Sequence, residues 1–341
     1  MLYCFHVYLD DFFPLFLNKH TKPMSQTPTL WTVGLFSVSL LVLLSVSCKK
    51  TDTTVITETG PPTTAAQLRQ RAIDDYNNYY ISSNTAFAWS GSTSTCAAGT
   101  LPVSVQDKVI KRINFYRRIV GLPTNCVFTT LLNEKSQQAA LMMQSNQRCD
   151  GTPNPSWSCY SIDGANAWTN ALAADGYIGA DAIDTWMIGE QDQTGALLDR
   201  RWILFSRGKT YGHGSANSFA ALYAKHNFNN PPTTLQLPQF IAYPPAGYIA
   251  SDLFYPNLAW SFSIPNADFR TAAVTVKNAD GITIQTTKFP VLDLEADNTL
   301  VFRPKLTYAL TKDTKFSVTV ANVRVNGSLK TYNYDVIWVK R

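Results

Sequence analysis

The chain has 341 residues, of which 45% are hydrophobic and 16% are charged. A length of this order allows about two domains, and the hydrophobic fraction excludes a chain that is disordered throughout. The formal net charge is +5, from 29 Lys and Arg against 24 Asp and Glu, and the basic residues form no continuous stripe. We therefore exclude a dedicated nucleic-acid-binding protein.

An apolar run near the N-terminus predicts export. Residues 30–46 carry no charge and are followed by Ser47, Cys48 and two lysines. The run is shorter than the about 20 residues of a membrane span and is typical of a signal-peptide core. The residues around Cys48 resemble a bacterial lipobox, which predicts a leader over 1–48 and a lipid anchor on Cys48. A plain cleaved signal and an uncleaved anchor helix are the alternatives.

The residues on either side of this apolar run help to predict the start of the chain and the location of the protein. Met24 is an alternative start, which would make residues 1–23 a start-site artefact, although Lys19 and Lys22 supply the positive charges that precede the apolar run. Residues 49–67 are rich in Thr and predict a mobile tether. We expect a membrane-anchored lipoprotein that faces the periplasm or the cell exterior.

Four cysteines follow the leader: Cys96, Cys126, Cys149 and Cys159. An even number of cysteines in an oxidising compartment predicts disulfides. Four cysteines allow three pairings, and we favour Cys96–Cys126 with Cys149–Cys159 because the second pair brackets a turn-rich segment. The absence of C-x-x-C spacing in the sequence argues against a zinc–thiolate site.

The residues after the tether predict a mainly helical domain over 68–235. Apolar residues recur at helical spacing from Leu68, and Ser104 to Asp107 resemble a capping box that opens a longer helix. That helix is expected to end at Gly121. The further elements expected are a helix over 132–144, a short helix N-capped by Asp181, a helix that begins at Thr194, and strands over 210–215 and 218–224.

The pattern changes at about residue 240. Apolar and polar residues alternate over short stretches, as in Phe316, Val318 and Val320. Asp280-Gly281 and Asn326-Gly327 are typical hairpin turns. Short strands at regular spacing predict a small antiparallel β-sandwich domain over 240–341.

Three stretches of the helical part form a characteristic series of motifs. They are INFYRRIVGLP at 113–123, GTP to SWSCY at 151–160, and DRRWIL at 199–204 followed by YGHG at 211–214. Together they resemble the CAP superfamily (cysteine-rich secretory proteins, antigen 5 and pathogenesis-related proteins) in its bacterial form, and they cover about 105–225. The resemblance implies an α-β-α sandwich, and some bacterial members carry a C-terminal β-domain. The expected fold class is α+β, with a CAP-like sandwich followed by the β-sandwich.

The resemblance also implies a cleft, which in the family often holds two His and two acidic residues that can bind a divalent metal. This chain has Gly151 at the first His, Ala165 or Thr169 at an acid, and Asp199 at the second His. We therefore expect a cleft without its metal ligands and no cofactor, with a bound divalent metal as the less favoured alternative. The candidate cleft residues are Gly151, Thr169, Asn170, Trp186, Asp199, Arg200 and His213.

Apart from the resemblance, the sequence contains few residues suited to catalysis near neutral pH. His213 lies in a predicted strand, either as a cleft residue beside Asp199 or as a surface residue, and His226 is the other histidine beyond the leader. Arg200 with its neighbours is typical of solvated or interdomain ion pairs. An acidic cluster offers oxygen ligands for Ca²⁺ without EF-hand spacing, although two of its members equally suit a helix N-terminus. Its members are Asp181, Asp184, Glu190 and Asp192.

These observations favour a non-catalytic binding or interaction protein of the cell envelope, with a glycan, lipid or protein as its ligand. The alternative is an exported hydrolase that acts on peptide or envelope polymers and uses Asp199, His213 and Glu190. Convergence of these side chains within hydrogen-bond reach distinguishes the two hypotheses.

Overall fold

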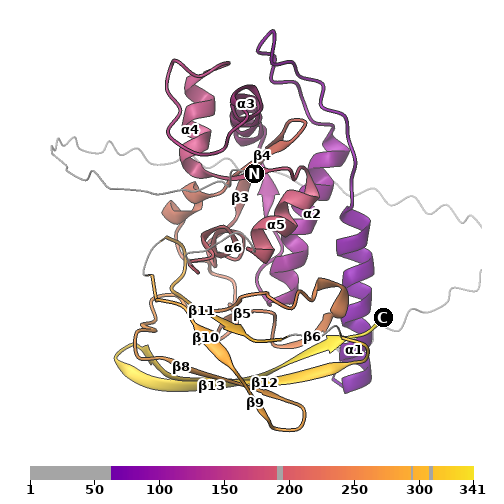
Figure 1. The fold of residues 1–341 in the computed structure, drawn as a ribbon, viewed down its shortest axis with the longest axis vertical. Helices are drawn as coiled ribbons and strands as arrows, with labels where there is room; N and C mark the ends of the chain where they lie inside the picture. The colour runs from indigo at the N-terminus through magenta and orange to yellow at the C-terminus, as the bar shows by residue number, and fades with distance from the viewer. Residues whose placement is uncertain (1–62, 190–194, 293–294, 307–309) are drawn as a thin grey trace, which may run out of the picture. The chain divides into compact units, whose positions relative to one another are not determined.

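The computed structural model describes residues 63–189, 195–292, 295–306 and 310–341 (Figure 1). The predicted leader, Cys48 and most of the predicted tether lie outside these residues. The fold is mixed α+β, and residues 62–341 cluster into one compact unit. Among the helices of the described ranges, none has the length and apolar character that crossing a bilayer requires.

The helical part is a sheet with helices on both faces. The strand order is β1-β3-β4-β2, with β1 parallel to β3 and the other pairs antiparallel. The strands are β1 (Val127–Phe128), β2 (Ala171–Asp175), β3 (Thr210–Ser215) and β4 (Phe219–Tyr223). The helices are α1 (Ala65–Asp75), α2 (Val103–Ile119), α3 (Thr130–Asn146), α4 (Ile162–Asn170), α5 (Ala180–Ile188) and α6 (Leu198–Ile203).

The two faces of β3 explain how the helices pack. A Cβ added to Gly212 or Gly214 would lie 2.3 Å from the α3 backbone, so α3 rests directly on the glycine side of the strand. The other side carries large groups: the Tyr211 hydroxyl donates to a carbonyl of α6, and the His213 ring reaches Gln106 of α2. Alternation along one strand therefore separates α3 and α4 from α2, α5 and α6.

A single turn of π-helix, Tyr76–Tyr80, continues α1 and leads into a 3₁₀ turn, Ile81–Ser83. The rings of Tyr76 and Tyr80 stack with centroids 4.8 Å apart. Two more 3₁₀ turns lie at Lys225–Asn229 and Ser251–Leu253.

The β part consists of two sheets, β10-β11-β7-β5 and β6-β13-β12-β8-β9. Aromatic side chains join their inner faces, as in Trp260 with Phe316 and Phe262 with Tyr334. The strands of the first sheet are β5 (Ile241–Tyr243), β7 (Trp260–Ser263), β10 (Thr286–Lys288) and β11 (Thr299–Pro304). Those of the second are β6 (Gly247–Ala250), β8 (Ala273–Asn278), β9 (Thr283–Ile284), β12 (Thr314–Val325) and β13 (Ser328–Val339).

Both predicted hairpin turns are confirmed, since they join β8 to β9 and β12 to β13. The expectation of an entirely antiparallel arrangement is wrong for one pair, because β6 runs parallel to β13. No hairpin connects these two strands, and alternation along a strand does not indicate the direction of a distant partner.

Several predicted helix boundaries need correction. The helix α2 begins at Val103 after Pro102, without a side-chain cap, so Ser104 lies inside it. Gly121, with a φ of +77°, ends it as predicted. The N-cap of α5 is Gly179, and Asp181 lies in the first turn. The predicted start at Thr194 lies outside the described residues.

Buried arginines join the helical part to the β part. Arg200 donates to the carbonyls of Met187 (2.6 Å) and Ile188 (3.0 Å), which end α5. Its Nη1 also donates to the Ala259 carbonyl, just before β7, at 2.6 Å. The neighbouring Arg201 donates to the carbonyls of Leu292 and Asp297. The sequence predicted ion pairs for this helix, whereas the acceptors shown for Arg200 and Arg201 are mainly backbone carbonyls.

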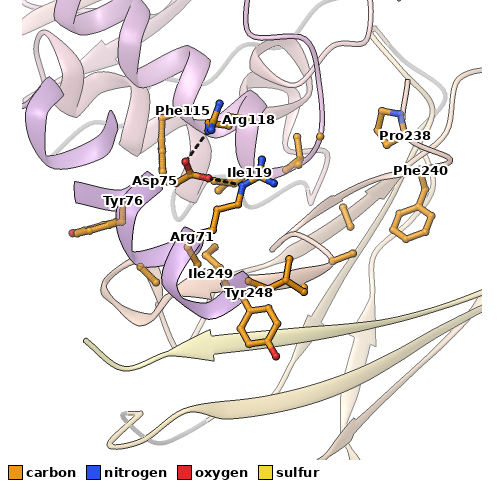
Figure 2. Close-up of a pocket in the computed structure, with 18 of the residues that line it drawn as sticks. Arg71, Asp75, Tyr76, Phe115, Arg118, Ile119, Pro238, Phe240, Tyr248 and Ile249 are labelled. Atoms are coloured by element: carbon orange, nitrogen blue, oxygen red, sulfur yellow. Dashed lines mark hydrogen bonds and ion pairs between the residues drawn. The ribbon is translucent and has the colours of Figure 1, made fainter. Parts of the chain in front are cut away.

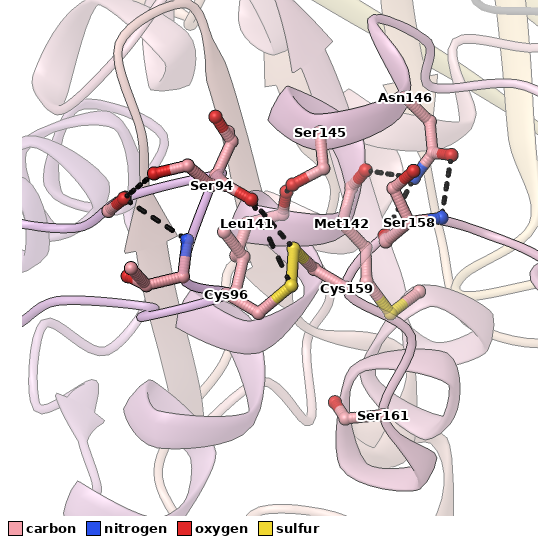
Figure 3. Close-up of a disulfide and its surroundings, with 12 residues drawn as sticks. Ser94, Cys96, Leu141, Met142, Ser145, Asn146, Ser158, Cys159 and Ser161 are labelled. Atoms are coloured by element: carbon pink, nitrogen blue, oxygen red, sulfur yellow. Dashed lines mark hydrogen bonds between the residues drawn. A yellow bond between two sulfur atoms is a disulfide. The ribbon is translucent and has the colours of Figure 1, made fainter.

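The predicted cysteine pairing is wrong. Cys96 is bonded to Cys159, and the bond lies beside Leu141 and Met142 of α3 (Figure 3). Cys149 is also disulfide-bonded, though not to Cys159. Cys126 is a free, buried thiol. Its sulfur lies 3.5 Å from the Gly208 carbonyl on the α2 side of the sheet, whereas the loop that carries Cys96 lies on α3.

We expect replacement of Cys96 and Cys159 by Ser to lower the free energy of unfolding. The bond closes a loop with a sequence separation of 63, for which loop-closure entropy gives about 4 kcal/mol. Denaturant unfolding of the double variant and the wild type measures the loss. A non-reducing peptide map that pairs Cys96 with Cys126 would contradict the assignment.

We expect Arg200→Met to destabilise the protein by about 3 kcal/mol or more, because it leaves several buried carbonyls without a donor. Arg270→Met is the matched control: Arg270 is exposed and pairs with Asp268, so its loss should cost about 1 kcal/mol or less. Equal losses of unfolding free energy in the two variants would show that Arg200 does not hold α5 and the residue before β7 together.

Candidate functional site

The candidate cleft residues lie on both sides of the sheet. Gly151 belongs to the α3–α4 side, where its carbonyl accepts a hydrogen bond from Trp168 at 3.1 Å. Thr169 and Asn170 end α4, and their side chains donate to carbonyls of their own helix. Thr169 is exposed and Gly151 is exposed.

The other candidates lie on the opposite side. Trp186 is buried in α5, and its indole N–H donates to the Ala173 carbonyl at 3.0 Å. Arg200 is buried between the end of α5 and the start of β7, and Asp199 is half-buried one residue earlier on α6. Glu190 lies outside the described residues. Trp186 and Arg200 therefore serve the core rather than an open cleft.

His213 is fully buried, so it is neither a surface residue nor an open cleft residue. Its Nδ1 lies 3.2 Å from Gln106 Oε1, and its Nε2 lies 3.0 Å from Ser215 Oγ. Burial lowers the pKa of His213 to about 3, so the ring is neutral at physiological pH. Both ring nitrogens are occupied, and Asp199 is not their partner.

The Ser215–His213–Gln106 chain has the order of a catalytic triad, in which a base activates a hydroxyl and a third group orients the base. Ser215 Oγ accepts from the Gly179 N–H at 3.2 Å, which leaves its proton for His213. However, Ser215 is as fully buried as His213, and a substrate could not reach the hydroxyl. The chain of hydrogen bonds ties β3 to α2 and α5.

The predicted acidic cluster does not assemble around an ion in the described residues. Asp184 accepts hydrogen bonds from Arg112 and from the hydroxyls of Tyr80 and Tyr116, the latter two at 2.8 Å. Burial raises the pKa of Asp184, while Arg112 opposes this rise. Asp181 is exposed, and Glu190 and Asp192 lie outside the structure described. Within the described ranges no group of three or more His, Cys, Asp or Glu gathers as a metal site would require.

A pocket of about 510 Å³ lies between α1, the C-terminal end of α2 and strand β6 (Figure 2). We call it the α1–β6 groove. Its volume is within the range of small-molecule sites. Its walls are largely apolar, and the larger side chains that form them are Leu68, Tyr76, Phe115, Ile119, Phe240, Tyr248 and Ile249.

Three charged residues lie in this groove. Arg118 Nε donates to Asp75 Oδ1 at 2.8 Å, and Arg71 Nε lies 3.6 Å from Asp75 Oδ2 (Figure 2). Two guanidinium groups thus share one carboxylate, which leaves a net charge of about +1. The terminal nitrogens of Arg118 have no hydrogen-bond partner among the described residues, and its side chain is 32% exposed.

Sequence reasoning missed this groove. In the sequence, Arg118 appeared only within the stretch 113–123. Its partner Asp75 on α1 and the β6 residues that line the same groove are far away along the chain, and no local pattern marks the contact. The available signal was the i,i+4 spacing of Arg71 and Asp75, which is common on exposed helices.

Comparison with protein-family models and with curated proteins gives no match for this chain. The groove is accordingly interpreted from its own residues.

We expect the burial of His213 to make stability depend on pH. Its folded pKa is depressed, so its contribution is complete above the unfolded pKa of about 6.5 and falls as the pH drops toward 3. Between pH 8 and pH 5 the wild type should lose about 2 kcal/mol from this residue. Denaturant unfolding at several pH values, compared with His213→Gln, isolates this part.

His226→Gln is the control, because His226 is only half-buried and its pKa is lowered by a weaker burial. Identical pH slopes in the wild type and His213→Gln would contradict a buried, neutral His213.

Proposed function

We propose that the chain is a non-catalytic binding module whose ligand occupies the α1–β6 groove. The observation that carries this proposal is that a ligand can reach the groove but cannot reach the buried candidate residues. The groove is open to solvent and has apolar walls with charged groups. His213 and Arg200, in contrast, are buried.

The lining of the groove favours binding over catalysis. Arg71, Asp75 and Arg118 are its charged residues, and they are paired with one another. No His, Cys, Ser, Lys or Glu lies among the described residues that line it. Asp75, Tyr76 and Tyr248 are lining residues of types that can serve general acid–base or nucleophilic catalysis, and the Asp75 carboxylate is engaged by both arginines.

The proposal includes the setting predicted from the sequence: an exported CAP-like protein with a lipid anchor on Cys48. The order of the three motifs supports the CAP-like fold, and a sheet between two layers of helices agrees with the α-β-α arrangement. The Cys96–Cys159 disulfide is compatible with an oxidising compartment.

A thermal-shift screen of carboxylates, sugars and short peptides tests this function on the full-length protein in detergent micelles. Ala246 is exposed and lines the groove, so Ala246→Trp should fill it. Ala66→Trp is the control, since Ala66 is exposed on α1 outside the groove. A compound at a hundred times its Kd should add about 2.7 kcal/mol of stability to the wild type and the control, but not to Ala246→Trp.

The same preparations decide the hydrolase alternative. We expect no turnover of peptide or cell-envelope polymers by the wild type above that of Asp199→Asn. Turnover that this substitution abolishes would establish the alternative, and compounds that stabilise Ala246→Trp as well as the wild type would place the ligand elsewhere.

A further inference from the structure

The strand β6 is an edge of its sheet. It pairs with β13 on one side, and no described residue forms a backbone hydrogen bond with its other side. Strand residues present their N–H and C=O groups to alternate sides. An edge strand thus carries unpaired donors and acceptors that can accept a further strand.

The α1–β6 groove runs along this open edge. All of residues 246–250 line it, including the neighbours Tyr248 and Ile249. Successive strand side chains point to opposite faces of a sheet, and Tyr248 and Ile249 both line the groove. The facing wall is α1, which supplies Leu68, Ala72 and Tyr76.

We propose that the groove binds a peptide in extended conformation, which adds to β6 as a new strand and whose C-terminal carboxylate pairs with Arg118 and Arg71. This inference rests on the proposed function, since it names the ligand class of the same groove. β6 has four residues, so the recognised segment is about four to five residues long.

Charge complementarity supports a terminal carboxylate. Arg71 and Arg118 carry two positive charges against the single carboxylate of Asp75. A guanidinium group binds a carboxylate through two parallel hydrogen bonds, and the terminal nitrogens of Arg118 are available for them. Tyr79 packs against the same guanidinium at 4.7 Å and restricts its position.

The apolar wall and the open edge together select a peptide. An acyl chain would fill the space beside Phe115, Ile119 and Phe240, but it would leave the N–H and C=O groups of β6 unpaired. A strand satisfies these groups and places alternate side chains against the wall. Apolar residues are therefore expected at alternate positions of the peptide, beginning with the C-terminal one.

Fluorescence anisotropy with the full-length protein in detergent micelles tests the proposal. The probe is a fluorescein-labelled pentapeptide of alternating Thr and Val that ends in Leu. We expect saturable binding that weakens at least about tenfold when the C-terminus is amidated. Arg118→Gln and Arg71→Gln should each cause a comparable loss, whereas Arg270→Gln should cause none.

Backbone methylation of the peptide tests strand addition without altering the protein. N-methyl groups at alternate positions should abolish binding, while those between them should have little effect. Binding that resists methylation at every position would overturn strand addition. Equal affinity for the acid and the amide would overturn carboxylate recognition.

The outcome is separable from that of the proposed function. If other compounds stabilise the wild type but not Ala246→Trp, while the peptide does not bind, the groove is a binding site and the ligand class is wrong. If decanoate binds there in place of the peptide, the ligand class is likewise overturned. If nothing binds, both proposals fail.

Discussion

The arrangement of this protein depends on one buried guanidinium group. Arg200 satisfies carbonyls at the C-terminal end of α5, where a helix leaves its last C=O groups without partners. The same group holds the carbonyl that precedes β7. Because one rigid, planar donor set bonds to both parts, the helical part and the β part share a core, and the largest core cluster contains residues of both.

Two other buried arginines act in a similar way. Arg117 donates to the carbonyls of Ile203, Phe205 and Gly208 and so fixes the turn between α6 and β3. Arg112 bonds to the Tyr80 carbonyl, to Ser83 and to Asp184. These contacts hold the segment after α1 against α2 and α5. Two walls of the α1–β6 groove, α1 and α2, are thereby held together, because Arg112 of α2 bonds to the segment that continues α1.

Elements with strong local signals could be predicted. The helices α2 and α3, the strand β3 and the β12–β13 hairpin follow from periodicity and turn residues. The helix α4 and strand β2 were missed because their residues are mostly small or polar, as in IDGANAWTN and ALAAD, and give little contrast between faces. The disulfide pairing and the groove depend on which distant segments meet. Likewise, a charged residue such as Arg200 gives no sign in the sequence that it is buried.

The π-helical turn at Tyr76–Tyr80 determines which side chains of α1 face the groove. Tyr76 lines the groove, whereas Tyr80 bonds to Asp184, so the turn adjusts the angle between the two ends of the segment. Each residue of an α-helix advances by about 100° around the axis. Removal of one residue from this turn would rotate α1 by that angle relative to α2 and replace Leu68 and Ala72 with a different stripe of side chains. A single-residue deletion or insertion in this turn would thus give the groove a new wall and would also move Arg69 and Asp75 away from their partners on other elements.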